Sequence, residues 1–118
     1  MTERPAPQAA GEDITVDVLD HAVVVRPVGE MDLDSIAALG AALSAALVHA
    51  SEARGVVVDC SRLEFCDSSA LNALLSARRT AVEAGSVIRL ESPNQQLRSL
   101  LEMTGTAGLF PLDPEPAG

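Results

Sequence analysis

The sequence has very few aromatic residues: two phenylalanines and no tyrosine or tryptophan in 118 residues. A core therefore has to be built from Leu, Val, Ile and Ala, and hydrophobic residues make up 47% of the chain. The shortage argues against single-stranded nucleic acid as a ligand, because proteins that bind it stack its bases on aromatic side chains. Length and hydrophobic content together predict one folded domain.

Basic residues are also scarce, with 8 Lys and Arg against 17 Asp and Glu and a net charge of −9 at pH 7. Such a surface repels the phosphates of nucleic acids and of anionic lipids, so we expect no nucleic-acid partner. No apolar run approaches the roughly 20 residues of a membrane helix, so we expect no membrane insertion. The N-terminus lacks the basic and apolar regions of a signal peptide, which favours a cytoplasmic protein.

Cysteine is limited to Cys60 and Cys66, too few for a disulfide scaffold. Their spacing is not the C-x-x-C of redox proteins, and they have no nearby histidine to complete a zinc site. We expect free thiols, as in a reducing cytosol, and interpret Cys66 as a small buried hydrophobic residue. We expect no metal site.

Hydrophobic periodicity predicts strands and helices in the order strand, strand, helix, strand, helix, strand, helix, strand. This order is typical of a single α/β domain, with a mixed sheet of about five strands and helices packed on it. We expect the domain at residues 13–110, between flexible tails at 1–12 and 111–118. The expected strands are 14–19, 22–28, 56–59, 87–90 and 109–110, with a loop at 59–67.

The ends of the three helices carry local signals. Asp32 or Asp34 can cap the first helix. Ser92 is expected to cap the third, as the start of a capping box with Pro93 and Gln95. The second helix is expected to end near Gly85 and the third at Gly105.

The most distinctive stretch is residues 65–71, Phe-Cys-Asp-Ser-Ser-Ala-Leu, where a strand and loop lead into the second helix. The spacing places two hydroxyls and a carboxylate in the first helical turn. A first turn has free N–H groups and a partial positive charge, which suits phosphate chemistry. A simpler interpretation is that Asp67 or Ser68 only caps the helix, and for Asp67 the sequence leaves both interpretations open.

Enzyme motifs are missing. A serine nucleophile needs a base within hydrogen-bond reach, but nothing places His21 or His49 against Ser68, and no G-x-S-x-G elbow is present. No G-x-G-x-x-G or G-x-x-x-x-G-K-[ST] loop is present either. We therefore expect a protein without catalytic residues and without a cofactor.

Four segments together resemble the STAS domain, and more narrowly the bacterial anti-sigma factor antagonists. The resemblance covers about residues 14–110, and Asp67-Ser68-Ser69 is its most specific motif. The sequence departs from the family at Ala70, where glycine is usual. The segments are Gly29-Glu30-Met31-Asp32, residues 56–59, residues 63–71 and Thr104-Gly105.

The resemblance implies a partner switch. In the family, an anti-sigma factor that is also a serine kinase phosphorylates the serine after the aspartate, here Ser68, and a phosphatase restores it. The unphosphorylated antagonist binds the anti-sigma factor and frees the sigma factor. The alternative is a STAS scaffold subunit of a larger signalling or lipid-transport complex, without a phosphorylation cycle. The implied partner-binding residues are Glu30, Met31, Asp32, Asp67, Ser68, Ser69 and Leu71.

Overall fold

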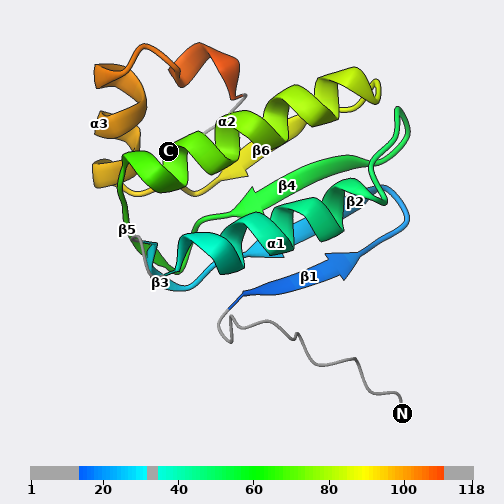
Figure 1. Ribbon diagram of the computed structural model, residues 1–118, viewed down its shortest axis with the longest axis horizontal. Helices are drawn as coiled ribbons and strands as arrows, with labels where there is room; N and C mark the ends of the chain where they lie inside the picture. The colour runs from blue at the N-terminus through cyan, green and yellow to red at the C-terminus, as the bar shows by residue number, and fades with distance from the viewer. Residues whose placement is uncertain (1–13, 32–34, 111–118) are drawn as a thin grey trace, which may run out of the picture.

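The fold is built on a four-stranded sheet with the order β1-β2-β4-β6. A computed structural model describes residues 14–31 and 35–110 (Figure 1). Strand β1 (Thr15–Val18) runs antiparallel to β2 (Ala22–Arg26), whereas β2, β4 (Gly55–Asp59) and β6 (Ile88–Glu91) are parallel. The expected mixed sheet of a single α/β domain is thereby confirmed.

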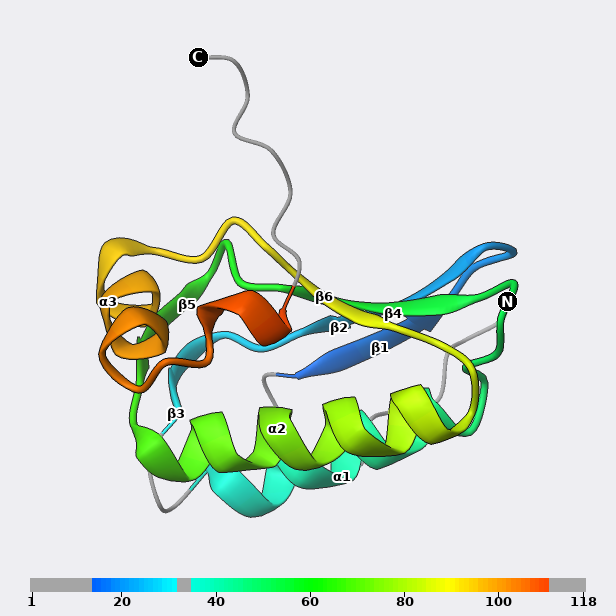
Figure 2. The same cartoon turned by 90° about the horizontal axis from the view of Figure 1, so that it is seen from above.

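Helices α1 (Ile36–Leu47) and α2 (Ser68–Glu83) connect the parallel strands and lie side by side on one face of this sheet (Figure 2). Alternate strand residues point to that face. Full burial of one such aliphatic side chain contributes about 1.5–3 kcal/mol, so these rows hold the helices to the sheet. Six of them, each at most 2% exposed, form two rows across the parallel strands: Val23, Val56 and Ile88, then Val25, Val58 and Leu90.

A second, two-stranded sheet pairs β3 (Gly29–Met31) with β5 (Leu63–Cys66) in parallel. The expectation of a loop over all of 59–67 is therefore wrong, and β3 lies where no strand was predicted. The strands are three and four residues long, and the segments that pair are more than 30 residues apart in the sequence. Strands this short give almost no periodic signal, so only the folded chain brings them together.

Helix α3 (Gln95–Met103) begins later than the capping box predicted. Its N-cap is Asn94, whose Oδ1 accepts a hydrogen bond from the Leu97 N–H at 2.9 Å. Ser92 instead takes a φ of 55°, which is incompatible with starting a right-handed helix. The predicted end is confirmed, because Gly105 follows the last turn with a φ of 72°.

The end of the described chain also differs from expectation. A short 3₁₀ helix, η1 (Ala107–Leu109), replaces the predicted last strand, and Phe110 is buried in the core.

Helix α1 starts after Ser35, which makes no side-chain capping bond. The expected caps Asp32 and Asp34 and the expected tails lie outside the described residues. Among the described helices, none has the length and apolar character needed to cross a membrane.

Candidate functional site

The candidate site is the junction between β5 and α2. Asp67 is the N-cap of α2, with extended backbone angles of φ −99° and ψ −173°. Its Oδ1 accepts hydrogen bonds from the Ser69 N–H at 2.9 Å and from the Ala70 N–H at 3.1 Å. Asp67 therefore does cap the helix, and it already occupies two of the amides that a bound phosphate would need.

Ser68 is the first residue of α2, and its side chain is exposed. Among the described residues, no hydrogen-bond partner of its hydroxyl is found. Ser69 is half-buried, and the methyl group of Ala70 is completely buried. The alanine that replaces the family's usual glycine thus fits the fold, and Ser68 is the more accessible of the two hydroxyls.

Strand β3 supplies the neighbouring surface, but only in part as predicted. Glu30 is exposed and pairs in register with Phe65 of β5. Met31 and Leu71 are each 3% exposed and belong to the core, so their side chains offer little surface in the free chain. Burial of such apolar side chains in the core is favourable, because it removes their apolar surface from water. Asp32 lies outside the described residues.

Two side-chain amides that no sequence pattern indicates hold β5 from the side of α3. Asn94 donates from Nδ2 to the carbonyl oxygens of Leu63 and Glu64, both at 3.1 Å. Gln96 accepts from the Cys66 N–H at 3.0 Å and donates to the Cys66 oxygen at 2.8 Å. These bonds replace a neighbouring strand on the open edge of β5.

The thiols of Cys60 and Cys66 are both buried and have low reactivity at neutral pH. Burial raises the pKa of Cys60 to about 12, with smaller contributions from the nearby Cys66 and from the negative charges of Asp59 and Glu91. Burial also raises the pKa of Cys66 to about 11, helped by the adjacent Asp67. Both remain protonated at neutral pH, so neither is a ready nucleophile or metal ligand. Within the described ranges, no cluster of His, Cys, Asp and Glu could hold a metal ion.

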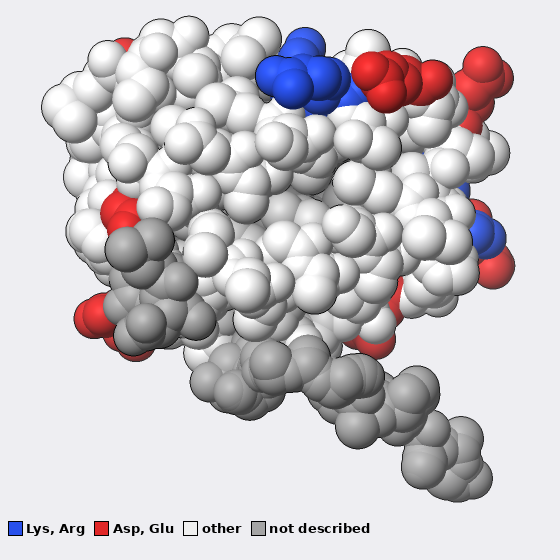
Figure 3. Space-filling view, in the orientation of Figure 1, with Lys and Arg blue, Asp and Glu red and all other residues white. Residues whose placement is uncertain are grey.

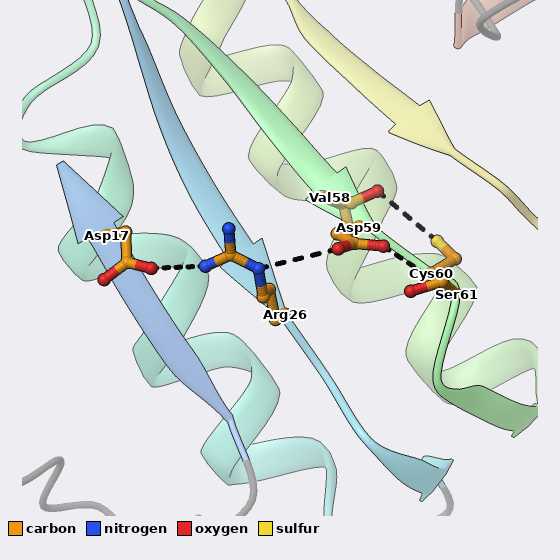
Figure 4. A network of polar contacts seen from close by, with 6 residues as sticks. All are labelled: Asp17, Arg26, Val58, Asp59, Cys60 and Ser61. Carbon is orange, nitrogen blue, oxygen red and sulfur yellow. Dashed lines mark hydrogen bonds and ion pairs between the residues drawn. The ribbon is translucent and has the colours of Figure 1, made fainter. Parts of the chain in front are cut away.

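A separate polar cluster lies at the carboxyl ends of β2 and β4. Arg26 forms ion pairs with Asp17 and, at 3.5 Å, with Asp59 (Figure 4). An open hollow of about 560 Å³ lies beside it, and none of the predicted site residues lines that hollow. The two carboxylates pair with a part-exposed Arg26, so the cluster links side chains of β1, β2 and β4 and contributes at most about 1 kcal/mol per pair.

The sequence itself decides the family. Residues 14–111 match the family model described as "Mlab, STAS domain". The chain belongs to the STAS-domain family. The predicted resemblance to the STAS domain is thereby confirmed over all of the described residues, and the β5–α2 junction lies within the match. No curated protein sequence matches the chain significantly.

Solved structures of anti-sigma factor antagonists share this STAS fold. An antagonist from Mycobacterium paratuberculosis is 25% identical, covers 87% of this chain and 86% of its own, and has a TM-score of 0.75. A STAS-domain antagonist from Planctomyces limnophilus is 20% identical, with coverages of 91% and 93% and a TM-score of 0.78. The antagonist SpoIIAA in its unphosphorylated form is 22% identical, with coverages of 86% and 89% and a TM-score of 0.71.

SpoIIAA of Bacillus is also similar in its phosphorylated form. That structure is 23% identical to this STAS domain, covers 86% of this chain and 92% of its own, and has a TM-score of 0.64. At such identities, the likeness establishes the fold, and the roles of individual residues have to be argued from the chain itself.

Proposed function

We propose that this STAS domain is an anti-sigma factor antagonist switched by phosphorylation of Ser68. The observation that carries the proposal is an exposed serine hydroxyl at the first position of α2, directly after the capping Asp67. The likeness to SpoIIAA, known in unphosphorylated and phosphorylated forms, supports it. In this proposal the protein is a cytoplasmic substrate of a serine kinase and of a phosphatase, and is not itself an enzyme.

The switch acts through charge. A phosphoserine adds a charge of about −1.5 to −2 at pH 7. Because Asp67 already accepts from the amides of Ser69 and Ala70, these amides do not offset the new charge. The phosphate therefore adds to the negative charge of Asp67 at a surface fitted to a neutral hydroxyl. Each loss of about 1.4 kcal/mol weakens binding tenfold, so a local charge event is enough.

The proposed partner-binding residues are those of the junction and of its neighbouring strand. Glu30, Asp67, Ser68 and Ser69 contribute directly, with Asp32 from the segment after β3. Met31 and Leu71 lie beneath them and act by packing, since both are buried.

Mapping the modified residue tests the proposal. The purified chain is incubated with ATP and, one at a time, the anti-sigma factor kinases of its source organism, and the phosphosite is located by mass spectrometry. We expect one phosphate on the wild type and on Ser69→Ala, and none on Ser68→Ala. Phosphate on Ser69 alone, or no phosphate with any kinase, would count against the proposal.

A second candidate function is favoured by one observation: the description of the matched family names Mlab and no antagonist. In this candidate the domain is a scaffold subunit of a larger signalling or lipid-transport complex, and Ser68 is never modified. Purification of the native complex separates the two candidates. A transporter ATPase that still binds Ser68→Ala and Ser68→Asp equally well supports the scaffold, whereas a serine kinase supports the antagonist.

A further inference from the structure

We propose that Phe65 is the apolar anchor of a partner-binding surface made of Phe65, Glu30 and Glu64, here named the Phe65 surface. Phe65 is 41% exposed, whereas the other aromatic residue of the chain, Phe110, is 1% exposed. A protein with two aromatic residues that leaves one of them 41% exposed gives up part of its burial there. Aromatic side chains are enriched among the residues that dominate the binding energy of protein interfaces.

The main chain beneath Phe65 is held on both edges. Strand β3 pairs with one edge of β5, and the side chains of Asn94 and Gln96 bond the main chain on either side of Phe65. A partner therefore cannot add a strand to β5 and must contact its side chains. Because the strand is already fixed, ordering Phe65 costs little on binding.

The charges around Phe65 define the partner's chemistry. Glu30 is the register partner of Phe65, Glu64 precedes it, and both are exposed. Figure 3 shows acidic side chains on the side where Figure 1 has β3 and β5. We infer a protein partner with an apolar pocket for the phenyl ring, flanked by Arg or Lys side chains.

The Phe65 surface lies close in the chain to the proposed phosphorylation site, because Phe65 is three residues before Ser68. The identity of the partner as an anti-sigma factor kinase rests on the proposed function, whereas the position and chemistry of the surface do not. The surface adds an attractive anchor to the switch, whereas the proposed phosphate acts at Ser68 by placing a charge where the partner is fitted to a neutral hydroxyl.

Photo-crosslinking locates the surface in the full chain. One version of the chain carries p-benzoylphenylalanine in place of Phe65, and a matched control carries it in place of Val82. Both versions are expressed in the source organism. Val82 is 52% exposed. It lies fourteen residues beyond Ser68 on the same helix, or about 21 Å along its axis at 1.5 Å per residue. We expect cross-links to one protein from position 65 and not from position 82. No cross-link from position 65, or equal cross-linking from both, overturns the inference.

Affinity measurements with that purified protein provide the second part of the test. Phe65→Ala should raise the Kd at least tenfold, Phe65→Leu by less, and Val82→Ala not at all. Glu30→Gln with Glu64→Gln should reduce the salt dependence of binding. Melting curves and the Leu variant separate lost binding from lost folding. An unchanged Kd for Phe65→Ala overturns the inference.

The two proposals fail in different ways. If the protein cross-linked from position 65 binds through Phe65 but does not phosphorylate Ser68, the antagonist function fails and the Phe65 surface stands. If Ser68 is phosphorylated and Phe65→Ala binds the kinase normally, the Phe65 surface fails and the antagonist function stands.

Discussion

The side-chain amide of Gln96 forms two hydrogen bonds with the main chain of Cys66, accepting from its N–H at 3.0 Å and donating to its oxygen at 2.8 Å. The two bonds satisfy both main-chain polar groups of one residue, as a neighbouring strand would. They join the start of α3 to the residue before Asp67. The position of Ser68 therefore depends on a side chain 28 residues further along the chain.

Removing this amide should loosen the site. Gln96→Ala leaves the N–H and C=O of Cys66 without their partners in a part-buried position, which costs roughly 1–3 kcal/mol. Chemical denaturation measures the change in the free energy of unfolding, and hydrogen exchange should show faster exchange of the Cys66 amide.

The adjacent glutamine is a matched control for this prediction. Gln95 is exposed and bonds only the Ser99 hydroxyl, at 3.2 Å, so Gln95→Ala should change stability by less than about 0.5 kcal/mol. Equal destabilisation by both variants would show that the Gln96 bonds contribute nothing beyond helix propensity.

The cap of α2 gives a second prediction. Asp67→Ala should lower the free energy of unfolding by about 0.5–2 kcal/mol, because the amides of Ser69 and Ala70 lose their acceptor. Asp67→Asn keeps an acceptor oxygen and should retain most of that stability. If Asp67→Asn is as unstable as Asp67→Ala in urea titrations, the carboxylate charge matters more than the hydrogen bonds.

A third prediction separates the core from the surface of β3. Met31 is 3% exposed, so Met31→Ala should destabilise the fold by about 2–5 kcal/mol. Its neighbour Glu30 is exposed, and Glu30→Ala should stay within about 0.5 kcal/mol of the wild type. A stable Met31→Ala protein that has lost only partner binding would instead indicate a direct contact between Met31 and the partner.

The buried thiols predict how stability depends on pH. Above pH 9 the unfolded state loses thiol protons that the folded state keeps, because burial raises the pKa of Cys66 to about 11 and of Cys60 to about 12. The free energy of unfolding should therefore fall from pH 9 to pH 11, by roughly 1 kcal/mol per thiol per pH unit. The sequence contains no lysine or tyrosine, so few other groups titrate in this window.

The matching control removes the thiols. Denaturation of Cys60→Ala with Cys66→Ala between pH 9 and pH 11 should show little slope, whatever its absolute stability. A slope as steep as that of the wild type would assign the pH dependence to other groups.

Local signals explain what the sequence could predict. Each of these signals lies within a few neighbouring residues of the sequence. They are the apolar runs of β2 and β4, the leucine spacing of α2, the Asp67 cap and Gly105. These features place Ser68 at a helix start without knowledge of the tertiary fold.

The remaining features depend on contacts between distant segments. The pairing of β3 with β5 and the amide bonds of Asn94 and Gln96 join residues about 30 positions apart. The start of α3 was predicted two residues early, because Ser92, Pro93 and Gln95 match a capping box while Asn94 both caps the helix and bonds β5. A shift of two residues changes which side chains face β5. The capping-box pattern therefore points to Gln95, whereas Gln96 makes the bonds to β5.

The affinity of the proposed kinase for the chain with and without phosphate on Ser68 tests the central claim most directly. Phosphoserine can be incorporated at position 68 during translation, and isothermal titration compares that protein with the wild type and with Ser68→Ala. The account predicts that phosphate weakens binding by at least tenfold, while Ser68→Ala binds like the wild type. Equal affinity of the phosphorylated and unmodified proteins would contradict it.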